Sequence, residues 1–171
     1  MKLTHYFFLL LIFASLSCDQ PTEPTKYESP PPALTAAEQK KAEQDIIMKY
    51  TIDNGSRMSV TKSGIHFEIT NGAKQTNAAL GSAEKVIAHY HGTFLDGKVF
   101  DSSVDRGRPF SFEVGSVIPG WREAIRMMEV GDKGTFIIPS HLAYGRNGYP
   151  GLIEPNTILK FEIELLGIKD Q

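Results

Sequence analysis

The chain has 171 residues, of which 41% are hydrophobic and 22% are charged. This length accommodates one ordinary globular domain with appendages, and 18 basic against 20 acidic residues give a formal net charge of −2. Because no basic stripe or arginine-rich segment accompanies this charge, the composition argues against nucleic acid as a partner.

Residues 1–17 have the composition of a signal segment. Lys2 supplies a positive charge, residues 6–16 form an apolar run too short to span a membrane, and small residues precede Cys18, the only cysteine. The arrangement resembles a bacterial lipoprotein signal, after which the cysteine becomes the lipidated first residue. Ser15 stands where such signals usually have leucine, so an ordinary secretory signal or a short uncleaved anchor is the alternative. A single cysteine excludes an intrachain disulfide.

Residues 18–34 are expected to form a tether that begins at the lipidated cysteine. Its prolines are Pro21, Pro24, Pro30, Pro31 and Pro32. Proline removes amide donors and favours extended backbone, so this segment cannot build a core and should act as a semi-stiff spacer. Docking of a partner protein to the prolines is the alternative.

Residues 35–55 predict a helix. Thr35 followed by Glu38 is the pattern of a capping box, and the residues after it are mostly strong helix formers. The C-terminal end of the helix is apolar at Ile46, Ile47 and Tyr50. The Asn-Gly pair at 54–55 favours a turn that ends it. We expect the helix to pack on its own domain through this end, and a dimerisation or substrate-holding helix is the alternative.

Period-two alternation predicts β-strands from there to residue 168. Residues 56–82 contain two short alternating segments and predict a hairpin added before the core domain. In the next strand Ala88, Tyr90 and Gly92 share a face, and Asp96-Gly97 predicts a tight turn. Further strands are expected near residues 98–100, 110–112, 135–138 and 157–168.

Residues 119–128 fit one short amphipathic helix that Gly131 should stop. The predicted fold is therefore α+β. A curved antiparallel β-sheet wraps around one short α-helix in a domain of residues 83–171, with an N-terminal helix and hairpin extension.

Aromatic residues punctuate these strands and turns in a fixed order. The segments that carry them are residues 88–92 (Ala-His-Tyr-His-Gly), 97–103 (Gly-Lys-Val-Phe-Asp-Ser-Ser), 108–112 (Arg-Pro-Phe-Ser-Phe), 117–121 (Val-Ile-Pro-Gly-Trp), 143–145 (Ala-Tyr-Gly) and 159–161 (Leu-Lys-Phe). Alternating rings alone favour an ordinary core. Taken together, the segments resemble the FK506-binding-protein (FKBP) family of peptidyl-prolyl cis-trans isomerases over roughly residues 84–168.

The resemblance implies a proline-binding pocket with Trp121 as its floor and residues 144–155 as a flap. The residues implied in catalysis are Tyr90, Phe100, Asp101, Tyr144 and Phe161. Those implied in substrate binding are Phe110, Val117, Ile118, Trp121, Tyr149, Leu152 and Ile153. Arg106 and Phe112 would support them. In many members of the family His stands at the position of Tyr149 and Ile at that of Leu152, which puts substrate preference and drug affinity in doubt more than activity.

The resemblance also implies the partners. These are proline-containing polypeptides as substrates and FK506- or rapamycin-type macrolides as inhibitors, with no cofactor and no metal. His89 and His91 share a strand face, yet no nearby acid or thiol completes a ligand set, so we expect surface histidines.

Together with the signal, the sequence predicts a membrane-anchored extracytoplasmic lipoprotein on the periplasmic face of the inner or outer membrane. It would assist protein folding or assembly, as a monomer or as a weak dimer through the N-terminal helix. Gliding motility-associated isomerase lipoproteins have a similar layout. The alternative from another class is a non-catalytic binding module or holding chaperone for a membrane-associated machinery such as gliding motility.

Overall fold

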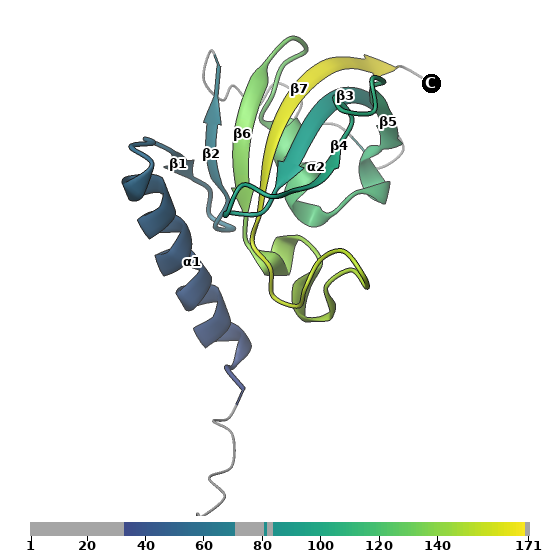
Figure 1. Ribbon diagram of the computed structural model, residues 1–171. Coiled ribbons are helices and arrows are strands. Elements are labelled where there is room, and N and C mark those ends of the chain that lie inside the picture. Colours follow the sequence, from purple (N-terminus) through teal and green to yellow (C-terminus); the bar gives the residue numbers. More distant parts are fainter. Residues whose placement is uncertain (1–32, 71–80, 82–83, 170–171) are drawn as a thin grey trace, which may run out of the picture. The chain divides into compact units, whose positions relative to one another are not determined.

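The computed structural model describes residues 33–70, 81 and 84–169 (Figure 1). The expected signal segment, the lipidated Cys18 and nearly all of the proline-rich tether lie outside these residues, as does the end of region 56–82. Leu34–Gln171 forms one compact unit, and Met1–Ala33 is assigned to another. No helix in the described part of the chain has the length and apolar character needed to cross a bilayer.

Helix α1 spans Ala36–Asp53 and begins with the predicted capping box. The Thr35 hydroxyl accepts from the Glu38 N–H at 3.3 Å, and the Glu38 carboxylate accepts from the Thr35 N–H at 2.8 Å. The helix ends at Asn54 as predicted. Ile47 is fully buried against Ile137 and Ile158, so α1 packs on its own domain, while Ile46 is 51% exposed.

Seven strands form one antiparallel sheet in the described residues. They are β1 (Ser59–Val60), β2 (His66–Ile69), β3 (Lys85–Thr93), β4 (Val99–Ser102), β5 (Phe110–Glu113), β6 (Lys133–Ile138) and β7 (Leu159–Lys169). Their order is β1-β2-β6-β7-β3-β4, and β5 also pairs with β3. The predicted turn at Asp96-Gly97 joins β3 to β4, with Gly97 at φ 88°. β7 thus lies in the middle of the sheet although it follows all the other strands in the sequence.

The β1–β2 hairpin is built into the main sheet. β1 pairs with β2 as predicted, but β2 also pairs along its whole length with β6, from His66 opposite Ile137 to Ile69 opposite Gly134. Ile65 and Ile69 are buried in the main core. The predicted hairpin therefore extends the main sheet beyond β6, and two of its apolar side chains belong to the main core.

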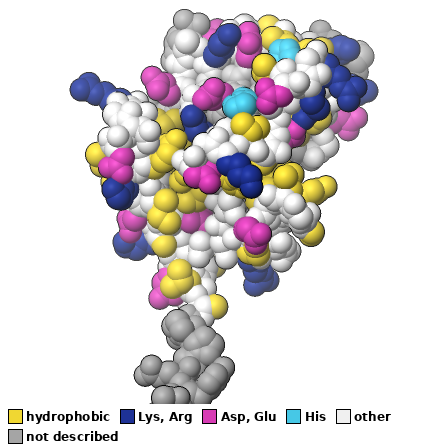
Figure 2. Space-filling model, viewed as in Figure 1, with side chains coloured by type: hydrophobic (Ala, Val, Ile, Leu, Met, Phe, Trp, Pro, Cys, Tyr) yellow, Lys and Arg dark blue, Asp and Glu magenta, His cyan; other side chains and the backbone are white. Residues whose placement is uncertain are grey.

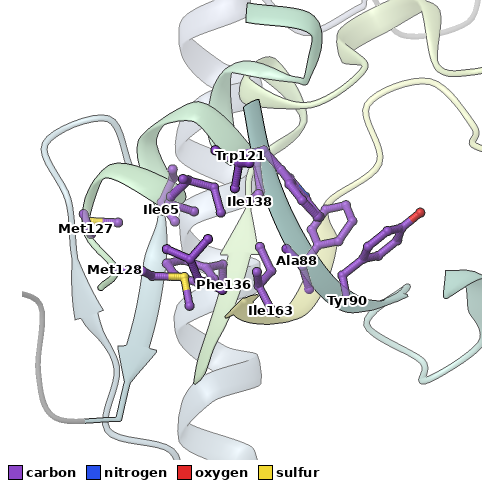
Figure 3. Close-up of a cluster of buried hydrophobic side chains, with 14 of the residues drawn as sticks. Ile65, Ala88, Tyr90, Trp121, Met127, Met128, Phe136, Ile138 and Ile163 are labelled. Carbon is purple, nitrogen blue, oxygen red and sulfur yellow. The ribbon is translucent and has the colours of Figure 1, made fainter. Parts of the chain in front are cut away.

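Helix α2 spans Pro119–Arg126 and buries Trp121, Ala124 and Ile125 in the main core. Figure 3 shows Trp121 among the buried side chains of this core. A Cβ on Gly120 would lie 2.5 Å from Cγ2 of Ile138, so this glycine lets the helix approach β6 closely. The helix ends before the predicted residue 128, because the N–H groups of Met127 and Met128 bond to carbonyls three residues back and tighten the chain into turns.

The two helices lie on opposite faces of the sheet (Figure 1). Ile137 packs under α1, whereas its strand neighbours Phe136 and Ile138 belong to the core that contains Trp121. Three short 3₁₀ turns complete the elements: η1 (Val114–Ser116), η2 (Ser140–Leu142) and η3 (Gly145–Asn147). The α+β fold predicted from the sequence, with a curved antiparallel sheet around one short helix, is confirmed.

Candidate functional site

Six rings from five elements gather on the α2 side of the sheet, and we call them the aromatic cluster. Its members are Tyr90 of β3, Phe100 of β4, Phe110 and Phe112 of β5, Trp121 of α2 and Phe161 of β7. Strand pairing brings them together, because β3 is hydrogen-bonded to β4, β5 and β7. Residues that are distant in the sequence therefore meet around one strand.

Trp121 lies at the centre of the aromatic cluster. Its ring centroid is 5.1 Å from that of Tyr90, 5.4 Å from Phe161, 5.4 Å from Phe112 and 6.4 Å from Phe110, with interplanar angles of 75–88°. These are edge-to-face contacts, an arrangement that the quadrupoles of aromatic rings favour. Trp121 is only 4% exposed, so its ring forms a fixed floor for the surrounding side chains.

Two rings of the aromatic cluster are only half-buried. Phe100 contacts Phe161 at 5.5 Å, and Phe110 stacks on Phe112 at 5.0 Å. A Cβ on Gly92 would lie 2.7 Å from Cζ of Phe100, so this glycine makes room for the ring. Apolar surface of Phe100 and Phe110 is therefore available to a ligand at one side of the cluster.

Ile118 and Val117 pack beside the aromatic cluster and are also half-buried. Ile118 is the residue before α2, and its carbonyl accepts from the Trp121 N–H at 3.0 Å. This contact fixes the backbone of Ile118 next to the central indole ring, where both residues were expected to form a rim.

A polar group lies at the edge of the aromatic cluster. Asp101 accepts hydrogen bonds from the Tyr90 hydroxyl through Oδ2 and from Arg106 through Oδ1, and Arg106 Nη2 also donates to the Tyr90 hydroxyl at 2.9 Å. Figure 3 shows this hydroxyl directed away from the buried side chains. The side chains of Asp101 and Arg106 are 39% and 40% exposed, so a carboxylate faces solvent beside the rings.

These contacts change the titration of Tyr90. Burial raises the pKa of the Tyr90 hydroxyl, and its hydrogen bond to Asp101 raises the pKa further. Tyr90 therefore stays protonated at neutral pH and keeps donating to Asp101. The arrangement holds a negative charge in place at the edge of an apolar surface.

The expected flap starts after η2 and folds back on itself. Tyr149 and Ile153 exchange two backbone hydrogen bonds of 2.8 Å, and the Asn156 N–H donates to the Gly145 carbonyl at 2.9 Å. The rings of Tyr144 and Tyr149 meet edge-on at 5.7 Å. Burial, with smaller effects from the charges of Asp101 and Tyr149, raises the pKa of the Tyr144 hydroxyl. It is therefore a protonated donor at neutral pH.

The three flap side chains that were expected to lie over a ligand differ in their exposure to solvent. Tyr149 and Leu152 are 53% and 48% exposed, whereas Ile153 is 4% exposed and belongs to the main core. Ile153 therefore packs in the main core, and its expected contact with a substrate stays a prediction.

Two residues next to the site were missed by the sequence reasoning. Phe94 packs on Phe100 with centroids 5.2 Å apart, and its spacing of two from Gly92 and four from Tyr90 was the available signal. Glu43 of α1 is buried against Ser140 at the base of the flap. No sequence signal pointed to that contact, because a glutamate in a polar helix is expected to face solvent.

The opposite face of the sheet carries a groove of about 420 Å³ whose lining includes His89, His91 and Glu162. Figure 2 shows acidic, basic and histidine side chains interspersed on the face in view. Two carboxylates of its lining form ion pairs, Glu164 with Lys133 at 3.2 Å and Glu162 with Lys160 at 3.0 Å. Among the described residues no three potential ligands are placed to hold a metal ion. We interpret the groove as a part of the sheet face that is exposed to solvent.

One serine and histidine pair also lies near this face. His89 Nδ1 is 3.0 Å from Ser103 Oγ, but Ser103 is fully buried and its hydroxyl accepts from the Tyr90 N–H at 2.8 Å. A substrate could not reach this hydroxyl, so the pair is structural and does not support nucleophilic catalysis.

Comparisons with known proteins agree on one family. Residues 74–166 match the family described as FKBP-type peptidyl-prolyl cis-trans isomerase. The FKBP-type 22 kDa peptidyl-prolyl cis-trans isomerase of Escherichia coli K12 is 44% identical over 123 residues, which are 71% of this chain and 59% of that protein. Outer membrane protein MIP of Legionella longbeachae is 37% identical over 133 residues, 78% of this chain and 56% of that protein.

A solved structure gives the same result for the fold. The peptidyl-prolyl cis-trans isomerase of Pseudomonas syringae pv. tomato superposes with a TM-score of 0.64 at 31% identity, covering 82% of this chain and all of that one. The chain spans about half the length of the curated relatives that it matches.

Proposed function

The chain belongs to the FKBP-type peptidyl-prolyl cis-trans isomerase family, and we propose that its aromatic cluster binds the proline ring of a polypeptide and accelerates rotation about the preceding peptide bond. The observation that carries the proposal is the placement of Trp121, enclosed by four rings, with the Asp101 carboxylate at the edge of the same cluster.

An apolar site suits this reaction. Rotation about an Xaa-Pro bond breaks no covalent bond but interrupts amide resonance, and without a catalyst it takes on the order of tens to hundreds of seconds. The planar amide is the more charge-separated form and is favoured by water, so rings that exclude water weaken that preference. Packing and hydrogen bonds that fit the twisted amide better than the planar one then lower the barrier.

Each part of the site has a role in this proposal. The indole of Trp121 lies under the proline ring, and the walls around it are Tyr90, Phe100, Phe110 and Phe161. Val117 and Ile118 form the rim, where the Ile118 N–H donates to a substrate carbonyl. The protonated Tyr144 hydroxyl donates to a second carbonyl, and Tyr149 and Leu152 contact the substrate from the flap.

Asp101 acts through its charge in this mechanism and transfers no proton. Arg106 and Tyr90 hold the carboxylate in place, which orients its field toward an amide whose charge distribution changes during rotation. Phe112 supports Phe110 from behind by stacking. Proline-containing polypeptides are the proposed substrates, and macrolides of the FK506 and rapamycin type are the proposed inhibitors of the same cluster.

We further propose that the protein works outside the cytoplasm as a membrane-anchored lipoprotein. The support is the apolar segment before Cys18, together with the similarity to a protein named outer membrane protein MIP. Metabolic labelling with a fatty acid analogue, compared between the natural chain and Cys18→Ser, tests this proposal. Labelling that persists in the variant would contradict it.

The test of the enzymatic proposal is the isomerisation rate of a Leu-Pro or Phe-Pro peptide with residues 19–171 as a soluble protein. Phe100→Ala and Asp101→Ala should each lower kcat/KM. The matched controls are Val99→Ala and Asp105→Ala, exposed neighbours outside the cluster, which should leave it unchanged. A folded protein without turnover would instead favour a module that binds partners without catalysis.

A further inference from the structure

The base of the flap is attached to α1 by a buried carboxylate. Oε2 of Glu43 accepts from the Ser140 N–H at 2.8 Å, and Oε1 accepts from the Ser140 hydroxyl at 2.5 Å and from Gln39 Nε2 at 2.7 Å. Glu43 and Ser140 are each 2% exposed. Burying a carboxylate is costly unless hydrogen bonds compensate it, and here three donors do so.

The attachment is made where the chain leaves β6 and turns toward the site. Ser140 begins η2, so its N–H has no acceptor within that turn and Glu43 supplies one. The Ala143 N–H donates to the Ser140 carbonyl at 2.8 Å, and Tyr144 is the next residue. The position of Tyr144 therefore follows from the position of Ser140 through a single hydrogen-bonded turn.

Neighbouring contacts hold the same turn. The ring of His141 is hydrogen-bonded to the backbone of Ser63 in the β1–β2 hairpin. Leu142 and Ala143 pack against the main core. Residues 140–143 are thus held from α1, from the hairpin and from the core, which leaves little freedom for the start of the flap.

We propose that Glu43 is a positioning residue for the site: it holds Ser140, and through it the flap that carries Tyr144, at the place that substrate binding and bond rotation require. This inference rests on the proposed isomerase function. The proposal gives α1 a role in the activity of the site, although no residue of α1 reaches the aromatic cluster in the described contacts.

A variant at Ile47, one helical turn after Glu43, distinguishes the proposed positioning role of Glu43 from the general packing of α1 on the domain. Ile47 is fully buried, and its buried neighbours Ile137 and Ile158 lie in and next to the sheet. Ile47→Ala weakens the packing of α1 without removing an acceptor from Ser140, so it is the matched control for Glu43→Ala.

The experiment uses the full chain in detergent micelles. In Glu43→Ala, kcat/KM for a Leu-Pro peptide should fall about tenfold, because displacing a reacting group's partner by about 1 Å has effects of this size or larger. Ile47→Ala should lose stability and keep kcat/KM within about twofold. Glu43→Gln should recover most of the rate, because its amide can accept from the Ser140 N–H and donate to the Ser140 hydroxyl.

A double-mutant cycle with Tyr144→Phe tests whether Glu43 acts through Tyr144. If it does, Glu43→Ala should lower the rate much less in the Tyr144→Phe background than in the natural one. Two effects that simply multiply would overturn the proposal, as would equal losses of kcat/KM in Glu43→Ala and Ile47→Ala.

Amide hydrogen exchange of residues 140–155 gives a readout that does not depend on turnover. Exchange should become faster in Glu43→Ala and remain nearly unchanged in Ile47→Ala. If the natural chain has no activity, the isomerase proposal fails while the exchange result still decides whether Glu43 anchors the flap. Equal exchange in both variants would refute the anchor itself.

Discussion

Gly92→Ala places a methyl group against the side chain and backbone of two proposed site residues. The new Cβ would lie 2.7 Å from Cζ of Phe100 and 3.1 Å from the Asp101 carbonyl oxygen. Ordinary contacts of this kind are about 3.5–4.0 Å, so the ring must move by about 1 Å. Phe100 is half-buried and can shift outward, so the cost to stability should be about 1 kcal/mol, the lower end for overpacking.

The activity should respond more strongly than the stability. A displacement of about 1 Å in a site can lower the rate up to about a hundredfold, so we expect kcat/KM to fall at least about tenfold. Gly134→Ala is the control, because its Cβ would lie 2.6 Å from Cε2 of Phe136, a buried ring outside the aromatic cluster.

The assays are peptide isomerisation and urea unfolding followed by the fluorescence of Trp121. Gly134→Ala should lower the free energy of unfolding at least as much as Gly92→Ala while retaining kcat/KM for the fraction that is folded. A folded Gly92→Ala protein with the natural kcat/KM would refute the proposed roles of Phe100 and Asp101 in the reaction.

Three further predictions concern single contacts. Tyr144→Phe should lower kcat/KM about two- to tenfold, the range for one hydrogen bond, and an unchanged rate would exclude the hydroxyl as a donor. Thr35→Ala removes the helix cap and should cost about 1 kcal/mol in urea unfolding, whereas Thr35→Ser should cost little. Burial lowers the pKa of His66 below its usual 6.5, so the folded state resists protonation that the unfolded chain accepts. Its contribution to stability is complete above pH 6.5 and is lost as the pH falls below that value. His66→Gln should therefore lose less free energy of unfolding than the natural chain between about pH 7.5 and 5.5, and equal losses would contradict this.

Local sequence patterns predicted those elements whose signals are local. The Thr35 and Glu38 capping box set the start of α1, and alternation around Tyr90 set the two faces of β3. Both depend on spacings of a few residues, which a sequence displays directly. The residues that meet in the aromatic cluster are distant in the sequence, and it was the resemblance of the ordered segments to the FKBP family that indicated them.

Features that depend on distant partners were not predictable in the same way. The pairing of β2 with β6 joins Phe67 to Phe136, and alternation within each strand does not state which strand lies beside it. The burial of Glu43 depends on Ser140 and could not be read from a helix with a polar composition. Likewise, the burial of Ile153 in the main core depends on distant packing partners that its hydrophobicity does not identify.

The central place of β7 sets the order in which the sheet can be completed during synthesis. β6 and β3 are separated by β7, which pairs with both, yet β7 is made after either of them. A growing chain can form α1 and short hairpins, but the two halves of the sheet stay apart until β7 has emerged. Sheets that need such long-range closure fold slowly. Completion of the described sheet therefore waits for β7.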